Sequence, residues 1–192
     1  MYKLGVDLGG TNIVAGVVDN SYKILGTGKL KTNAVRPADE IADDIAKAVE
    51  LAIEDAGVKK EEIESMGIGS PGAVDPISGT VCFAGNLGFV DVPLCKMLKD
   101  SVGADFYIEN DANSAAYGEY IAGAGKGTDN FIAITLGTGV GGGIIIDGKI
   151  YSGSNYAGAE LGHTVICMDG ESCTCGRRGC WEAYASATAL IR

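Results

Sequence analysis

Residues 3–18 read KLGVDLGGTNIVAGVV, and this stretch decides the first part of the fold. Residues 3–8 form a short apolar run that is typical of a buried strand, and residues 13–18 form a second, β-branched run. The turn Gly9-Gly10-Thr11 between the two runs therefore predicts a strand–turn–strand hairpin. A dinucleotide-binding fingerprint is excluded here, because that motif needs a helix directly after the glycine turn.

Strands and helices alternate over the rest of the chain, as expected for an α/β protein. The predicted strands are 24–31, 65–70, 106–109 and 131–136, and the predicted helices are 37–56, 92–99 and 111–122. A further hairpin joins 144–146 to 149–151 through Asp147-Gly148. A loop of small residues at 123–129 indicates a boundary between two domains, 1–122 and 123–192. The chain ends inside a helix that is predicted to start at Trp181.

Composition limits the class of protein. The 192 residues carry a formal net charge of −10, and 46% of them are hydrophobic, which permits a core and excludes disorder. The acidic balance argues against nucleic-acid binding, which needs a basic surface. No signal peptide and no apolar run of membrane-spanning length is found. Three of the six cysteines are bunched, unlike a secreted disulfide scaffold, so we expect a cytoplasmic protein without a membrane or nucleic-acid partner.

A glycine turn recurs in the second half of the chain. Backbone N–H groups in such turns can wrap phosphate oxygens, and an aspartate before the first turn can hold Mg²⁺ through water. The alternative is two ordinary glycine hairpins, although two copies facing one cleft favour phosphate binding. The predicted nucleotide- and phosphate-binding residues are Asp7, Gly9, Gly10, Thr11, Asn12, Gly137, Thr138 and Gly139.

The segment Glu109-Asn110-Asp111-Ala112-Asn113 places a carboxylate where a strand ends and a helix begins. One interpretation of Asp111 is a helix N-cap. The other is a general base, which accepts the proton of a sugar hydroxyl as it attacks the γ-phosphate of ATP. Asn110 beside it can orient the hydroxyl groups of the sugar.

The spacing H-x9-C-x-C-x4-C joins His163 to Cys173, Cys175 and Cys180. One imidazole and three thiolates are the ligands of a closed tetrahedral zinc site, which is structural rather than catalytic. The alternative is free or disulfide-paired cysteine. A zinc loop would hold the His163 ring so that its second nitrogen can reach a substrate. The cysteines outside this spacing are expected to be free thiols.

Together these motifs resemble the ROK family of sugar kinases and repressors, and within it the bacterial ATP-dependent glucokinases. The resemblance spans the whole chain, with matches at 7–12, 110–113, 160–163 and 173–182. It implies an α/β fold of the actin-like ATPase (ribonuclease H-like) type, with two domains, a ligand cleft between them and a second domain that is truncated. It also implies that Asp111 is the catalytic base. The hexose-contacting residues that it implies are Gly72, Asn86, Asn110, Asp111, Glu160, His163 and Glu182.

The predicted activity is transfer of the γ-phosphate of MgATP to the 6-hydroxyl of a hexose. The full zinc loop followed by Glu182-Ala183-Tyr184-Ala185-Ser186 resembles the glucokinases of the family, and this resemblance favours glucose, while N-acetylmannosamine and fructose stay open. A sugar-responsive repressor of the same family is the alternative of another class, but it needs an N-terminal helix-turn-helix, and the strand beginning at Lys3 leaves no room for one. An inactive sugar-binding fragment is a third interpretation. The resemblance also implies a homo-oligomer, either a dimer or a tetramer.

Overall fold

The predicted hairpin opens the fold of the computed structural model, which describes residues 1–154 and 156–192. β1 (Tyr2–Leu8) pairs antiparallel with β2 (Asn12–Val18), and β2 pairs antiparallel with β3 (Ile24–Lys31). On its other side β1 pairs in parallel with β4 (Ile63–Ser70), which pairs in parallel with β8 (Phe106–Asn110). The sheet order β3-β2-β1-β4-β8 confirms the α/β class expected from the sequence.

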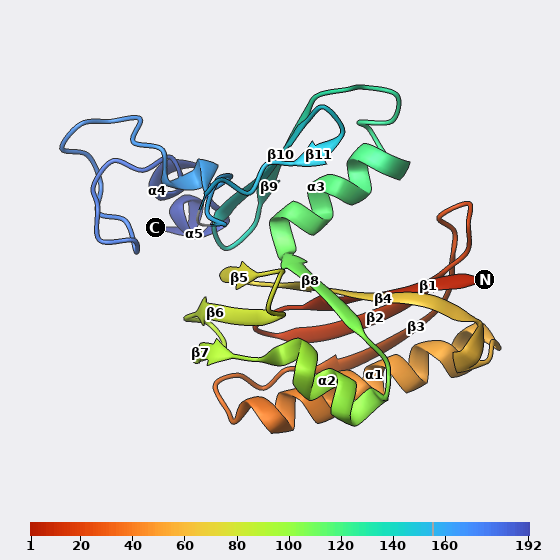
Figure 1. Ribbon diagram of the computed structural model, residues 1–192. Coiled ribbons are helices and arrows are strands. Elements are labelled where there is room, and N and C mark those ends of the chain that lie inside the picture. Colours follow the sequence, from red (N-terminus) through yellow and green to blue (C-terminus); the bar gives the residue numbers. More distant parts are fainter. Residues whose placement is uncertain (155) are drawn as a thin grey trace. The chain divides into compact units, whose positions relative to one another are not determined.

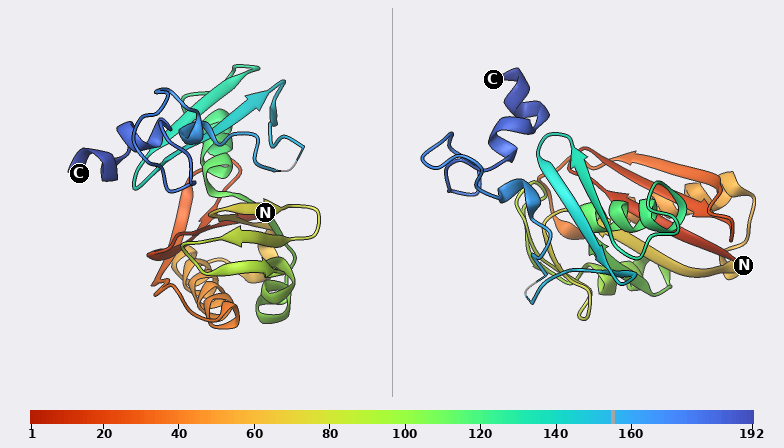
Figure 2. Two further views of the ribbon diagram at one scale, coloured as in Figure 1. Left: turned by 90° about the vertical axis from the view of Figure 1, so that its left-hand side faces the viewer. Right: turned by 90° about the horizontal axis from the view of Figure 1, so that it is seen from above.

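One face of this sheet is covered by the helices α1 (Ala38–Ala56) and α2 (Leu94–Val102), as Figures 1 and 2 show. Leu4, Val6 and Leu8 alternate along β1, point to this face and are buried. The buried residues of α1 recur at helical spacing and are Ile41, Ala42, Ile45, Ala48, Val49 and Ala52. Burying each large aliphatic side chain contributes about 1.5–3 kcal/mol. This core fixes the positions of the strand ends that carry the site.

A second, three-stranded sheet lies in the same unit, and the sequence pattern does not predict it. β5 (Ala73–Asp75), β6 (Thr80–Ala84) and β7 (Phe89–Val92) pair antiparallel in that order. Strands of three to five residues give too short a hydrophobic pattern to be recognised. The helix predicted at 92–99 is found as α2, but it starts two residues later because Val92 pairs with Val81 in this sheet. A single 3-10 turn, η1 (Lys60–Glu62), precedes β4.

The described chain divides into two units, Met1–Asp111 and Ala112–Arg192. The sequence placed the boundary after residue 122, whereas this division assigns nearly all of α3 (Asp111–Ala122) to the second unit. The reason is direct packing on a strand of that unit: a β-carbon added to Gly143 would lie 2.3 Å from the β-carbon of Ala116. Such an approach is possible only where glycine leaves space for the helix.

The second unit contains the sheet β11-β10-β9. β9 (Phe131–Leu136) and β10 (Val140–Ile146) form the repeated strand–turn–strand, and β11 (Lys149–Ile150) adds the short edge. The glycine turn is shorter than the run 137–143 suggests, because residues 140–143 already belong to β10.

The last part of the second unit contains a 3-10 turn, η2 (Leu161–His163), and two short helices, α4 (Glu182–Ala185) and α5 (Ala187–Ile191). The single helix predicted from Trp181 onward is therefore wrong. Ser186 interrupts it with an extended backbone, and its hydroxyl accepts the N–H of Ala189 as the N-cap of α5. Among the described residues, no helix combines the length and the apolar character that a membrane crossing needs.

Candidate active site

The carboxylates of Asp7 and Asp111 lie near one another at one edge of the five-stranded sheet. β1, β4 and β8 are parallel, so their carboxyl ends share this edge, and Asp7 and Glu109 both pair with Gly69. Asp111 follows β8 directly. The pKa of the Asp7 carboxyl is raised above its ordinary value, first by partial burial and second by the negative charge of Asp111. The predicted base and the predicted Mg²⁺-holding carboxylate are therefore neighbours.

The turn that follows β4 is tied to the end of β8. Asn110 donates from Nδ2 to the carbonyl oxygen of Gly72 over 3.1 Å. Gly72 has φ +84°, and a β-carbon there would lie 2.0 Å from the carbonyl oxygen of Phe83, so this position requires glycine. The structure thus brings two residues of the expected hexose-contacting set into direct contact.

Asn86 reaches the first glycine turn from the loop between β6 and β7. A β-carbon added to Gly10 would lie 3.4 Å from Asn86 Nδ2, which places the exposed amide of Asn86 against the turn. Spacing in the sequence gives no reason for this position. The position of Asn86 depends instead on the antiparallel pairing of β6 with β7. Asn86 lies in the tight turn between these strands, next to the turn that follows β1.

The first glycine turn is held by hydrogen bonds to its carbonyl groups. The N–H of Gly9 donates to the carbonyl of Asn12 over 2.9 Å and closes the hairpin. Thr32, which is fully buried, donates from its hydroxyl to the carbonyl of Gly9 over 2.6 Å and from its N–H to the carbonyl of Thr11 over 3.0 Å. Lys31 donates from Nζ to Oδ1 of Asn12 over 3.0 Å. Thr32 belongs to none of the motifs found in the sequence.

The second glycine turn has the same kind of support within its own unit. The N–H of Gly137 donates to the carbonyl of Gly139 over 3.0 Å and closes the turn. The N–H of Ala187 donates to the carbonyl of Gly137 over 2.9 Å, and the hydroxyl of Thr188 donates to the carbonyl of Thr138 over 2.8 Å. Both donors belong to α5, which sequence analysis did not connect with the turn.

The four predicted metal ligands are gathered in one cluster. One ligand atom from each of His163, Cys173, Cys175 and Cys180 lies within 4.8 Å of all the others. Sγ of Cys173 is 3.6 Å from Nδ1 of His163, and Sγ of Cys175 is 3.6 Å from Sγ of Cys180. With metal–ligand bonds of about 2.0–2.3 Å, the edges of a tetrahedral zinc site measure about 3.5–3.8 Å. Two of the six donor pairs thus already have the spacing of a tetrahedral zinc site, and the other pairs lie within 4.8 Å.

The thiol groups of this cluster titrate differently. The backbone N–H and the side chain of Arg177 donate to Cys175 and lower the pKa of its thiol to about 6. Burial raises the pKa of the Cys180 thiol to about 11. At neutral pH Cys175 is thus already a thiolate, the form that binds a metal ion, while Cys180 would lose its proton on metal binding.

The remaining predicted side chains of the second unit surround this cluster. Nε2 of His163 lies 4.0 Å from Oε2 of Glu160, on the side of the ring away from the thiols. Glu182 accepts the N–H of Val140 at Oε2 over 3.0 Å and the hydroxyl of Thr174 at Oε1 over 3.4 Å. Glu182 therefore links the cysteine-rich loop to the start of β10, directly after the second glycine turn, which is a role that the sequence did not suggest.

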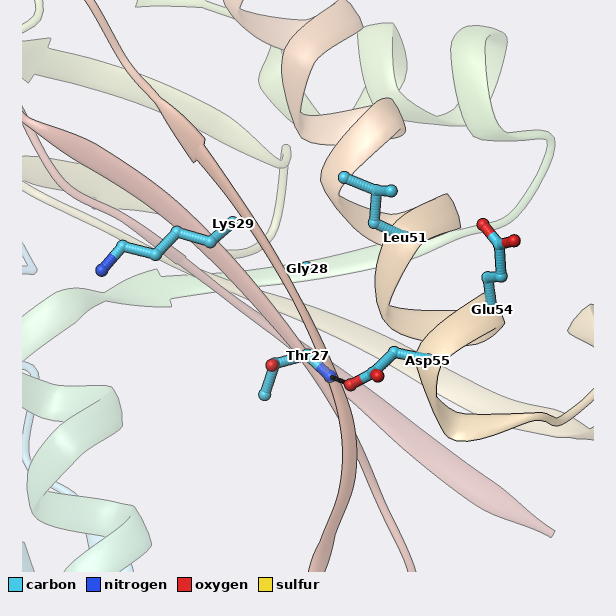
Figure 3. Close-up of a pocket in the computed structure, with 6 residues that line it drawn as sticks. All are labelled: Thr27, Gly28, Lys29, Leu51, Glu54 and Asp55. Atoms are coloured by element: carbon cyan, nitrogen blue, oxygen red, sulfur yellow. Dashed lines mark hydrogen bonds between the residues drawn. The ribbon is translucent and has the colours of Figure 1, made fainter.

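A hollow of about 430 Å³ lies elsewhere, between the edge strand β3 and α1 (Figure 3). Asp55 accepts the N–H of Thr27 over 2.8 Å across it, while the ammonium group of Lys29 points away from Asp55 and Glu54. Its polar groups do not converge, and none of the predicted site residues lines it. It carries no functional argument.

The chain matches known proteins over nearly its whole length. The family model described as the ROK family matches residues 3–192. The glucokinase of Streptomyces coelicolor is 48% identical over 189 residues, which are 98% of this chain and 57% of that protein. A putative xylose repressor of a Caldicellulosiruptor species is 34% identical over 189 residues, which are 98% of this chain and 47% of that protein.

Solved structures give the same result. A ROK family glucokinase from Streptomyces griseus, in complex with glucose and AMPPNP, superposes with a TM-score of 0.87 and 47% identity over 100% of this chain and 59% of that chain. This likeness confirms the expected actin-like ATPase fold. The chain spans less than two thirds of the length of each of these relatives.

Proposed function

The chain belongs to the ROK family, and on that premise we propose that it carries the hexose- and phosphate-binding residues of an ATP-dependent kinase, with glucose as the preferred hexose. The activity proposed is transfer of the γ-phosphate of ATP to the 6-hydroxyl of the sugar. The observation that carries the proposal is the placement of Asp111 next to Asp7 and the first glycine turn in one unit. The proposal also requires that both units face a common cleft.

Asp111 acts in this proposal as the general base. A sugar hydroxyl is a weak nucleophile until its proton is accepted during attack, and positioned general bases contribute about 10²–10⁴-fold to such rates. Asp111 lies at the start of α3, and the adjacent Asn110 is held by its bond to Gly72. Asn110, Asn86 and the Glu160–His163 pair supply donors and acceptors for the other hydroxyl groups, each of which needs a partner once water leaves.

The two glycine turns act as phosphate-binding segments. Their backbone N–H groups, together with the Thr11 hydroxyl and the Asn12 amide, can donate to phosphate oxygens. A bound Mg²⁺ would neutralise phosphate charge, and the Asp7 carboxylate is the group in the first unit that would hold it, directly or through water.

Zinc has a structural role in the proposal. The ligands His163, Cys173, Cys175 and Cys180 would hold it, and a set of one imidazole and three thiolates leaves no position for substrate. The metal would keep the His163 ring in place, with Nε2 directed to the side of Glu160 where a sugar hydroxyl can bind. We also propose a homo-oligomer in the cytoplasm, where thiolates stay reduced.

The test is a coupled assay of ADP release with MgATP and a panel of hexoses. The proposal predicts turnover with glucose that exceeds turnover with N-acetylmannosamine and fructose. Turnover with N-acetylmannosamine alone would overturn the choice of glucose and keep the kinase. Glucose binding by calorimetry without ADP release from any hexose would favour a sugar-responsive regulator, the class represented by the similar xylose repressor.

A further inference from the structure

Each glycine turn is supported by a threonine from a different element. In the first unit, the hydroxyl of Thr32 donates to the carbonyl of Gly9 over 2.6 Å. Thr32 is fully buried, and its N–H donates to the carbonyl of Thr11, so both of its polar donors serve this turn. A buried hydroxyl that lost this acceptor would have no water to replace it.

The second unit repeats this arrangement with an unrelated segment. The hydroxyl of Thr188 donates to the carbonyl of Thr138 over 2.8 Å, and the neighbouring N–H of Ala187 donates to the carbonyl of Gly137 over 2.9 Å. The start of α5 that carries both donors is itself fixed by its N-cap, Ser186. The two turns thus share one pattern: a threonine hydroxyl and a main-chain N–H donate to two carbonyls of the turn.

Peptide geometry gives this pattern a consequence. In a planar trans peptide the carbonyl of one residue and the N–H of the next point in opposite directions. Fixing the carbonyls of Gly9 and Thr138 therefore directs the N–H groups of Gly10 and Gly139 away from the threonines. Within the described part of the chain, neither N–H donates to a protein acceptor. The N–H of Thr138 is directed in the same way, by the bond to the carbonyl of Gly137.

We propose that Thr32 and Thr188 are positioning residues that aim these N–H groups at the phosphates of the nucleotide. The inference rests on the proposed function, because it needs the turns to bind phosphate. N–H groups that are aimed before binding spare the nucleotide the entropy of ordering a flexible loop. A threonine that only stabilised its turn would affect unfolding and would leave phosphate affinity unchanged in the folded chain.

The test compares Thr32→Val and Thr188→Val with Thr32→Ser and Thr188→Ser. Valine keeps the shape of threonine and removes the hydroxyl, whereas serine keeps the hydroxyl. The probe is MgAMPPNP, titrated by calorimetry into the zinc-loaded 192-residue chain. A lost hydrogen bond of ordinary strength predicts about 3- to 10-fold weaker binding for each valine variant. The serine variants should stay within about twofold, and the effects should multiply in the double valine variant.

Glucose affinity of the same variants is the second measurement, and it should not change. Equal MgAMPPNP affinity in wild-type, valine and serine variants would overturn the role of the threonines while leaving phosphate binding by the turns intact. Weakening of glucose binding by the same factor would also overturn it, since that result indicates general damage. A wild-type chain that binds no MgAMPPNP would refute phosphate binding by this chain and, with it, the positioning role. Thr188 is exposed, so its variants test the idea even if Thr32→Val does not fold.

Discussion

Replacing Cys175 by serine should weaken zinc binding roughly a hundredfold, and the chain contains its own control. Cys175 and Cys167 are both exposed thiols of the same loop, so neither substitution opens a cavity. Only Cys175 belongs to the four-ligand cluster, where its Sγ lies 3.6 Å from that of Cys180. Cys167→Ser should therefore bind zinc like the wild type.

The size of the effect follows from the geometry of the cluster. The Sγ of Cys175 already lies at a tetrahedral-edge distance of 3.6 Å from the Sγ of Cys180, so this ligand is placed to bind the metal ion. Structural zinc sites with four ligands bind with about 10–16 kcal/mol, so one ligand accounts for about 3 kcal/mol, or roughly a hundredfold in affinity. The low pKa of the Cys175 thiol, about 6, means that the wild type releases little proton from this ligand at pH 7.

The assay is competition with a chromophoric chelator at pH 7, with zinc stoichiometry measured on the purified protein. The wild type and Cys167→Ser should each hold one zinc per chain, and Cys175→Ser should release it to the chelator. Wild-type zinc affinity in Cys175→Ser, or equal loss of zinc from both serine variants, would contradict the assignment of Cys175 as a ligand.

Three further predictions concern stability and are measured by urea unfolding. Asp7→Asn should be more stable than the wild type at pH values above 3.8, the ordinary pKa of the carboxyl group. The pKa of Asp7 is raised in the folded state, so ionisation lowers the stability of the wild type as pH rises, and the two proteins should be equally stable below pH 3.8. A stability difference that is the same at every pH would contradict this. Gly72→Ala should cost more than about 1 kcal/mol, whereas Gly5→Ala, whose β-carbon meets nothing within 4 Å, should be close to neutral. Glu182→Ala should cost the second unit about 1–3 kcal/mol by leaving the Val140 N–H without its acceptor; unchanged stability of the zinc-loaded chain would disprove that.

The parts of the site that the sequence predicts are local in the chain. Each glycine turn occupies a few consecutive residues, and the zinc ligands lie within 18 positions from His163 to Cys180. Residue type and spacing are then enough to predict the zinc site, because few other chemistries need an imidazole and three thiols so close together. The first hairpin and the long helix α1 are predictable for the same reason, since their periodic patterns are strong.

The missed parts depend on contacts between distant segments. The bond from Thr32 to Gly9 spans 23 positions, and that from Thr188 to Thr138 spans 50. Asn86 reaches the first turn only through the short strands of the β5-β6-β7 sheet, which leave no periodic signal. The helix predicted from Trp181 onward also ran through Ser186, where the structure has a break. The serine hydroxyl forms hydrogen bonds with nearby backbone groups, so serine favours a cap position over a helix interior.

The most direct test of the proposed phosphate transfer is a single-turnover measurement of phosphate passing from ATP to glucose by Asp111→Asn. The account predicts a rate about 10²–10⁴-fold below the wild type, with glucose affinity retained, because asparagine cannot accept the proton. Asp105→Asn, at an exposed aspartate paired with Lys99 just before β8, should transfer phosphate at the wild-type rate. A wild-type rate in Asp111→Asn would contradict the general-base role and the mechanism built on it.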